Sequence, residues 1–416
     1  MNSRVPQRTT QWPHYRRILV AGVGLCLGAQ VAVGQAPVDT TPRLTISGFG
    51  QADFIVDFKR NDPLWFDVNR PSRLPSGPDQ FGGDGNTYVS ARQSRFGVLA
   101  HLPTRRGEMM AQFSFDMFGV GPDAGQTTIR LRHAWGKWHH FGGGLLESPF
   151  MDVDVFPNIL EYWGPNGMLF FRNAQIFWEP IDSGKANLRI ALERPGASAD
   201  VSNFADRIEL QNVKPHYPLP DLSAGYKYGG KWGYVRLSGM LRDIRWVQRP
   251  TDTLDLSGHV TGWGTSLSSN LKLFSQDVLR LQATYGAGIQ NYFNDAPIDV
   301  GAKFNLSNRR TPLTGEALPI FGGSAYLDHY WNPRVTTAIG MSVVNINNSD
   351  AQPTNAYHNG EYASANLLWV PVTNVLMGAE FQYGRRVNVA DGWSFNDYRL
   401  QISFKYSFSK EFGGTP

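Results

Sequence analysis

Apolar and polar side chains alternate one by one along much of this chain. In Leu44–Phe58 the even positions are apolar or glycine, whereas the odd positions include Gln51, Asp53 and Asp57. The segment Tyr398–Phe408 alternates in the same way. Because successive side chains of a β-strand point to opposite faces, each such segment predicts a strand with one apolar and one polar face.

The length of these segments distinguishes them from the strands of a soluble sandwich. They run for about ten residues or more, which a tilted strand needs to cross a membrane. Roughly sixteen candidate strands lie between Leu44 and Phe412, and hydrocarbon cannot satisfy unpaired backbone groups, so they must close into a barrel. The predicted fold class is an all-β, closed antiparallel transmembrane barrel. About sixteen strands would leave a water-filled channel.

Turn residues predict connections that alternate in length. Pro103–Gly107, Tyr228–Lys231 and Ser275–Asp277 are expected to be short hairpins, whereas Asn61–Asn86 and Asn291–Pro319 are expected to be long outer loops. Aromatic girdles are expected where strands begin or end. The candidates are Trp135, Trp138, Trp178, Trp232, Trp246, Trp331 and Trp369.

Residues 1–34 predict a cleaved signal peptide. Four arginines precede an apolar run, Ile18–Val33, and small residues at Ala32 and Gly34 favour cleavage after Gly34, within about two residues. A membrane anchor is the alternative, but the run is short for a span and is interrupted by glycines. The expected order after the signal is a short periplasmic segment over 35–43, the barrel over 44–412 and a tail over 413–416.

Removal of the signal changes what the composition implies. It leaves 382 residues (416 − 34) and 35 Lys+Arg (39 − 4) against 35 Asp+Glu, so the mature chain is neutral. The basic isoelectric point therefore gives no argument for nucleic-acid binding. The single cysteine, Cys26, leaves with the signal, which excludes disulfides and a thiolate metal site.

The most specific motifs cluster in residues 130–175. They read Arg-Leu-Arg-His-Ala-Trp-Gly at 130–136, Glu-Ser-Pro-Phe-Met-Asp at 147–152, Phe-Pro-Asn at 156–158, Trp-Gly-Pro-Asn-Gly at 163–167 and Arg-Asn-Ala-Gln at 172–175. With these motifs, with Arg-Gln-Ser-Arg-Phe-Gly at 92–97 and with Tyr-Gly-Ala-Gly-Ile at 285–289, nearly the whole mature chain resembles the DcaP-like porin family of Gram-negative outer membranes.

The resemblance implies a sixteen-stranded barrel in the cell outer membrane, a homotrimer, and passage of small anionic solutes such as dicarboxylates. Outer-membrane lipid, lipopolysaccharide and the barrel assembly machinery are its expected partners. Two features depart from the family. No coiled coil precedes the barrel, and the chain continues past Phe408, so the last strand ends there or extends to Phe412.

Phe150–Asn166 lies between the fifth and sixth candidate strands, where porins fold a loop inward. The residues alone leave an ordinary surface loop equally open, and the resemblance favours the inward loop. The expected constriction residues are Phe150, Asp152, Asp154, Pro157, Glu161, Gly164 and Asn166.

Basic residues on the polar faces carry the predicted selectivity, because a wall of positive charge favours anions. The expected channel-lining residues are Arg130, Arg132, Arg236, Arg242, Arg280, Arg399, Lys272 and Lys405, with the acids Asp53, Asp57, Asp116 and Glu380. Arg130 and Arg132 are the first candidates because they lie beside the specific motifs. For any one arginine, pairing with an acid is the simpler role. Alternation does not assign a face to Arg92, Arg95 or Arg172.

No sequence motif points to catalysis. Phosphate loops, dinucleotide-binding glycines and spaced Cys/His ligands do not occur, and the neighbours His139 and His140 would point to opposite strand faces. The sequence therefore predicts no catalytic residue, cofactor or metal. The alternatives are a channel without preference, a phosphate-type channel, or an outer-membrane hydrolase or adhesive scaffold. A hydrolase would need a Ser-His or Asp-His arrangement.

Overall fold

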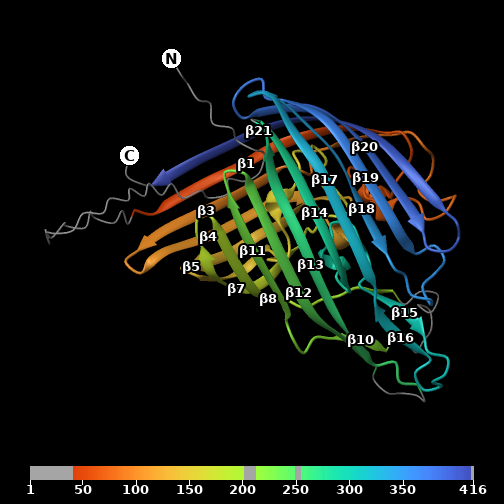
Figure 1. Ribbon diagram of the computed structural model, residues 1–416. Helices are drawn as coiled ribbons and strands as arrows, with labels where there is room; N and C mark the ends of the chain where they lie inside the picture. The colour runs from red at the N-terminus through yellow and green to blue at the C-terminus, as the bar shows by residue number, and fades with distance from the viewer. Residues whose placement is uncertain (1–40, 201–211, 249–253, 275, 414–416) are drawn as a thin grey trace.

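The computed structural model describes residues 41–200, 212–248, 254–274 and 276–413. The described chain forms a closed antiparallel barrel of sixteen strands, as predicted. Figure 1 shows the barrel from the side, with β1 and β21 next to each other. The predicted signal peptide, residues 1–34, lies outside the described residues.

Long β-strands make up the barrel wall. They are β1 (Arg43–Asp57), β2 (Asn86–Ser90), β3 (Arg95–Thr104), β4 (Gly107–Phe118), β5 (Thr127–Trp138), β6 (Phe141–Glu147), β7 (Arg172–Asp182), β8 (Ala186–Glu193), β10 (Val213–His216), β11 (Asp221–Gly230), β12 (Gly233–Gln248), β13 (Gly258–Leu273), β14 (Asp277–Ala287), β17 (Pro319–Asn332), β18 (Val335–Ile346), β19 (Tyr357–Trp369), β20 (Val375–Asn388) and β21 (Ser394–Gly413). Both β2 and β3 pair with β1, and both β10 and β11 pair with β12, so each of these pairs occupies one position in the wall.

The first and last strands close the barrel. Their register is continuous from Arg43 opposite Gly413 to Asp57 opposite Arg399. The last strand therefore runs beyond Phe408 and ends at Gly413. Figure 1 shows that β1 begins and β21 ends at the end of the barrel that carries the short turns.

Alternation places the polar faces inside, as the sequence predicts. Phe54 is 45% exposed on the outer surface, while its neighbour Asp53 is 1% exposed. The girdle prediction is wrong for two tryptophans. Trp135 is three residues from the outward Trp138, so it lies on the opposite, inner face of the strand. There it donates a hydrogen bond to Gln112. Trp246 also lies on the inward face of its strand and donates a hydrogen bond to the Leu256 carbonyl.

The long connections lie at the other end of the barrel. There β9 (Ala199–Asp200), β15 (Val300–Phe304) and β16 (Leu313–Ala317) form a separate small sheet, of which Figure 1 labels β15 and β16. None of the described helical segments is long and apolar enough to cross a membrane.

Candidate functional site

Residues 148–171, here called the inner loop, connect β6 to β7 through the interior of the barrel. Asp152 accepts hydrogen bonds from Tyr234 of β12 (2.8 Å) and Ser268 of β13 (2.6 Å). Farther along, Glu380 of β20 accepts from the backbone N–H of Leu160 at 2.7 Å. These partners face inward on strands that are distant in sequence, so the loop lies against the inner wall.

The tip of the inner loop reaches the opposite wall. The Tyr162 hydroxyl contacts Asp116 of β4 and accepts from Arg132 of β5 at 2.6 Å. Its ring stacks on Phe118 with centroids 4.2 Å apart. Because the loop contacts β12 and β13 through Asp152 and β4 and β5 through Tyr162, about half a barrel away, it crosses the interior and narrows it.

Two further loops pack against the inner loop. Asp295, between β14 and β15, accepts from Arg70 at 2.9 Å and from the Ser72 N–H at 2.8 Å, while Asn69 N–H donates to Glu161. The Arg70 guanidinium also lies 4.1 Å from the Trp65 ring. Part of the predicted outer loop Asn61–Asn86 therefore folds inside the barrel, because its charged groups find partners there.

The expected constriction residues all lie on the inner loop, but they differ in their environment. Phe150 is fully buried in an apolar cluster with Tyr292, and Asp154 contacts Lys227 of β11. Gly164 has a φ of +80°, which favours glycine, and Asn166 is fully buried. The full set of expected constriction residues on the inner loop is Phe150, Asp152, Asp154, Pro157, Glu161, Gly164 and Asn166.

Arg130 and Arg132 share one acid. Arg130 donates to Asp116 through two nitrogens, at 3.0 and 2.7 Å, and Arg132 donates to the same carboxylate at 2.6 Å. A carboxylate between two guanidiniums neutralises one of the two charges. The pair therefore contributes one net positive charge, in a fixed geometry that also holds Tyr162.

The other expected lining residues fall into two groups, those that form an ion pair with a carboxylate and those that do not. Arg242 binds Asp221 and Asp299, each at 2.9 Å, Arg280 binds Asp328 at 2.6 Å, and Arg399 binds Asp57 at 2.8 Å. In the described part of the chain three expected residues have no carboxylate within ion-pair distance. They are Arg236, which donates to the Pro149 carbonyl of the inner loop at 2.6 Å, Lys272 and Lys405.

Lys405 lies near the tip of the inner loop together with two further cations, Arg95 and Arg172, that lack a carboxylate partner among the described residues. Arg95 and Lys405 both lie over the Phe49 ring, 5.4 and 4.4 Å from its centroid. Arg172 lies 4.7 Å from the Phe170 ring. All three side chains are partly exposed. In the sequence, alternation did not assign Arg95 or Arg172 to a strand face, and no pattern singled out Phe49.

These cations join Arg130 and Arg132 in one electrostatic neighbourhood, here called the basic cluster. Arg95 interacts with Arg130 and Arg132, Arg172 interacts with the same two arginines, and Lys405 interacts with Arg95. The carboxylates in this neighbourhood are Asp116, Glu147 and Asp53. Among these interacting groups of the described residues there are five cations and three carboxylates, so the positive charges outnumber the negative ones by two.

A β-bulge in β5 creates a Ser-His-Glu chain that the sequence did not reveal. The register with β4 shifts after Ser114, so His133 and Arg132 both face inward. Ser114 Oγ lies 2.7 Å from His133 Nδ1, and Glu147 lies 2.7 Å from His133 Nε2. Ser114 is fully buried, so its hydroxyl is not exposed to solvent. The hydrogen bonds between Ser114, His133 and Glu147 fix the wall near the basic cluster. They give no support to a hydrolase.

Glu161 is a buried acid that holds the inner loop. Its carboxylate accepts from the N–H groups of Asn69 and Gly164, and its own N–H donates to Glu380 at 3.1 Å. Burial raises the pKa of Glu161 to about 8, with a further rise from Glu380, although the two backbone N–H donors lower it. The side chain is therefore protonated at neutral pH.

We expect Glu161→Gln to flatten the pH dependence of stability. The folded pKa lies above the ordinary value, so the stabilising contribution is present below about pH 4 and is lost as pH rises through about 8. Thermal unfolding in detergent at pH 5, 7 and 9 measures this. The variant should be less stable than wild type at pH 5, because an amide keeps only one acceptor oxygen. Its free energy of unfolding should fall less between pH 5 and pH 9 than that of wild type. Asp79→Asn, at an exposed acid of the first long loop, serves as the control, and equal slopes in wild type and Glu161→Gln would contradict the assignment.

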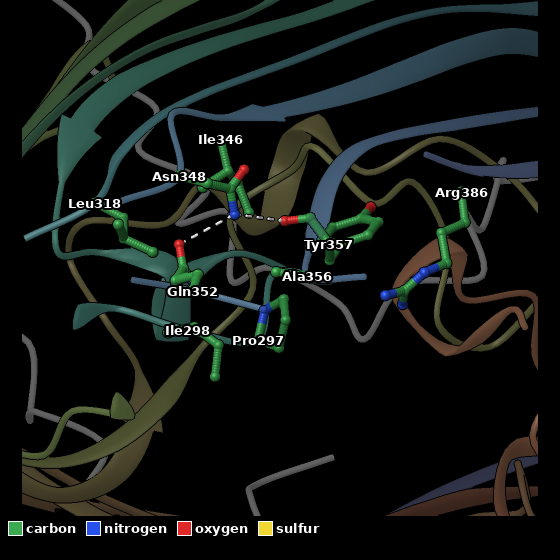
Figure 2. Close-up of a pocket in the computed structure, with 9 residues that line it drawn as sticks. All are labelled: Pro297, Ile298, Leu318, Ile346, Asn348, Gln352, Ala356, Tyr357 and Arg386. Carbon is green, nitrogen blue, oxygen red and sulfur yellow. Dashed lines mark hydrogen bonds between the residues drawn. The ribbon is translucent and has the colours of Figure 1, made fainter. Parts of the chain in front are cut away.

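A small open pocket of about 220 Å³ lies beside the long loops (Figure 2). Asn348 stands at its centre and donates to Gln352 Oε1 (3.1 Å) and to the Tyr357 carbonyl (3.2 Å). At one side, Arg386 donates to the carbonyls of Ser72 and Asn355. The guanidinium thus ties the wall to the first long loop, and the pocket is a gap between interlocked loops.

The DcaP outer membrane protein family matches residues 80–408. The chain belongs to this family. The outer membrane channel DcaP of Acinetobacter baumannii has a similar crystal structure, with a TM-score of 0.72 at 18% identity over 88% of this chain and 97% of that chain. The anion-selective porin from Comamonas acidovorans gives a TM-score of 0.56 at 8% identity, over 88% and 100%. The trimer form of OmpT of Vibrio cholerae gives 0.51 at 11% identity, over 88% and 99%. No curated protein matches the chain.

The family resemblance noted in the sequence is thus confirmed, and the DcaP-family chain is an outer membrane channel protein with a porin fold. In such barrels the short turns face the periplasm and the long loops face outward. The inner loop of this DcaP-family barrel therefore narrows the interior below the outer loops.

Proposed function

We propose that this chain is a passive channel for small hydrophilic solutes that prefers anions, small dicarboxylates among them. The observation that carries the proposal is the excess of two positive charges in the basic cluster, beside the tip of the inner loop. A narrow passage strips part of the hydration from a solute, and fixed cations on its wall replace that hydration for anions alone. The likeness to an anion-selective porin agrees in fold with this proposal.

A planar bilayer under a salt gradient tests the proposal. The reversal potential of potassium chloride currents should shift toward the chloride equilibrium potential. Succinate should reduce the chloride current, whereas the uncharged succinamide of similar size should not. A reversal potential near zero would favour the channel without preference, and reduction by phosphate alone would favour a phosphate-type channel. A hydrolase or adhesin should give no stable conductance.

The assembly and export of the chain are part of the same proposal. We infer a homotrimer, in line with the trimer form of a protein of similar fold, and insertion by the barrel assembly machinery among outer-membrane lipid and lipopolysaccharide. Residues 1–34 would direct export across the inner membrane and would then be cleaved. N-terminal sequencing of the protein from outer membranes should begin near Gln35, and recovery of Met1 would contradict this.

A further inference from the structure

A row of basic side chains crosses the outer surface of the barrel, away from the lumen. His216 of β10 stands opposite Arg245 of β12, and Arg245 stands opposite His259 of β13. Opposite residues on neighbouring strands share a face and lie about 5 Å apart. Lys214, two residues before His216, shares that face. All four side chains are exposed, and we call them the outer basic row.

The outer basic row follows the upper edge of the apolar band. Leu192, Leu222, Leu241 and Trp263 stand opposite one another across β8, β11, β12 and β13, and each is at least 41% exposed. Arg245 is four residues beyond Leu241 on the same face, roughly 13 Å along the strand. On a strand tilted by about 45°, this distance places the row at the level of the lipid headgroups.

The outer basic row keeps a net positive charge through Lys214. Asp243, on the same face of β12, binds Arg245 at 2.7 Å. In the described residues it is the sole carboxylate within ion-pair distance of the row, and Lys214 has no ion pair there. The charge that remains faces the membrane surface, where basic residues attract anionic headgroups.

We propose that the outer basic row binds the phosphate groups of an outer-leaflet lipid, of the kind carried by the lipid A part of lipopolysaccharide. Four donors along about 10 Å of surface can contact two phosphates of one headgroup. The row faces the lipid and not the lumen, so its ligand is a membrane component and not a permeating solute. This site is separate from the basic cluster of the channel.

Binding of lipid A to the purified full chain, measured by native mass spectrometry, tests the proposal. Lys214→Gln with Arg245→Gln should weaken binding of bisphosphorylated lipid A roughly tenfold or more. The charge-conserving variant Lys214→Arg with Arg245→Lys should retain binding, and Lys303→Gln with Arg310→Gln, on the outer loops, should also retain it. Dephosphorylated lipid A and inorganic phosphate should bind wild type weakly, because one lacks the charge and the other lacks the acyl chains.

Channel measurements separate this proposal from the proposed function. The Lys214→Gln, Arg245→Gln variant should keep the wild-type conductance and reversal potential, which also shows that it folds. Unchanged lipid A binding in that variant would overturn the site, as would equal loss in the outer-loop control. A fall in oligomer size with unchanged lipid binding would assign the row to a second copy of the chain and would also overturn the proposal.

Discussion

Replacing Arg95, Arg172 and Lys405 together by glutamine is expected to reverse the selectivity of the channel. These cations have no carboxylate partner in the described chain, so their removal changes the net charge of the basic cluster from two positive to one negative. In a partly dehydrated passage the effective dielectric is near 20, and a unit charge acts with about 4 kcal/mol at about 4 Å. We expect the ratio of chloride to potassium permeability to fall by about tenfold or more, measured as the reversal potential in a salt gradient.

The control removes the same charge elsewhere. Lys303→Gln, Arg309→Gln and Arg310→Gln change exposed residues of the outer loops, where salt screens charges beyond about 10 Å, and should leave the reversal potential unchanged. Arg130→Gln with Asp116→Asn removes one charge of each sign and should change it little. If the triple variant kept the wild-type preference, the unpaired cations would not set selectivity.

Arg130→Ala with Arg132→Ala is expected to shift the reversal potential toward cations for a different reason. Both arginines bind Asp116, so the double variant leaves that buried carboxylate without either partner. It also releases the Tyr162 hydroxyl from Arg132. We therefore expect a loss of thermal stability along with the change in selectivity, whereas the unpaired cations should affect selectivity alone.

Gly167→Ala is expected to widen the channel, because glycine allows the inner loop to touch the wall. A Cβ atom at this position would lie 2.1 Å from the Val343 carbonyl oxygen and 2.8 Å from that of Gly323. The Gly167 N–H donates to Ser342 at 2.8 Å, and that hydrogen bond would also be lost. We expect the flux of neutral sugars into liposomes to rise several-fold, with a loss of stability of about 1–3 kcal/mol from overpacking.

Gly50→Ala is the matched control, since a Cβ atom there would meet nothing within 4 Å. It should leave sugar flux and unfolding temperature at the wild-type values. An unchanged sugar flux in Gly167→Ala, in protein that inserts normally, would show that this contact does not set the channel width.

The fold could be predicted because alternation follows from backbone geometry and needs no knowledge of distant contacts. Asp53 and Phe54 fall on the faces that their parity assigns. The same rule fails at the β5 bulge, where Arg132 and His133 face inward together, because a bulge depends on the partner strand. It also says nothing about loops, so the burial of Trp65 within a predicted outer loop was not foreseen.

The candidate site was harder to predict, because charge pairing is a property of three-dimensional neighbours. Parity indicated that Arg280 and Arg399 face the lumen, but it could not show that Asp328 and Asp57, each from another strand, bind them. The cations that remain without a carboxylate could be identified only after those pairs were known. The ring of Phe49, which two of them share, belongs to an otherwise ordinary strand.

The seam between β1 and β21 has a consequence for biogenesis. Arg43 and Gly413 are partners, so the hydrogen bonds that complete the cylinder join the two extremes of the described sequence. Until the final strand has been delivered, β1 presents an open edge whose backbone groups hydrocarbon cannot satisfy. A polypeptide truncated before Ser394 would keep that edge exposed. We therefore expect membrane integration to require translocation of the complete chain, including the last strand.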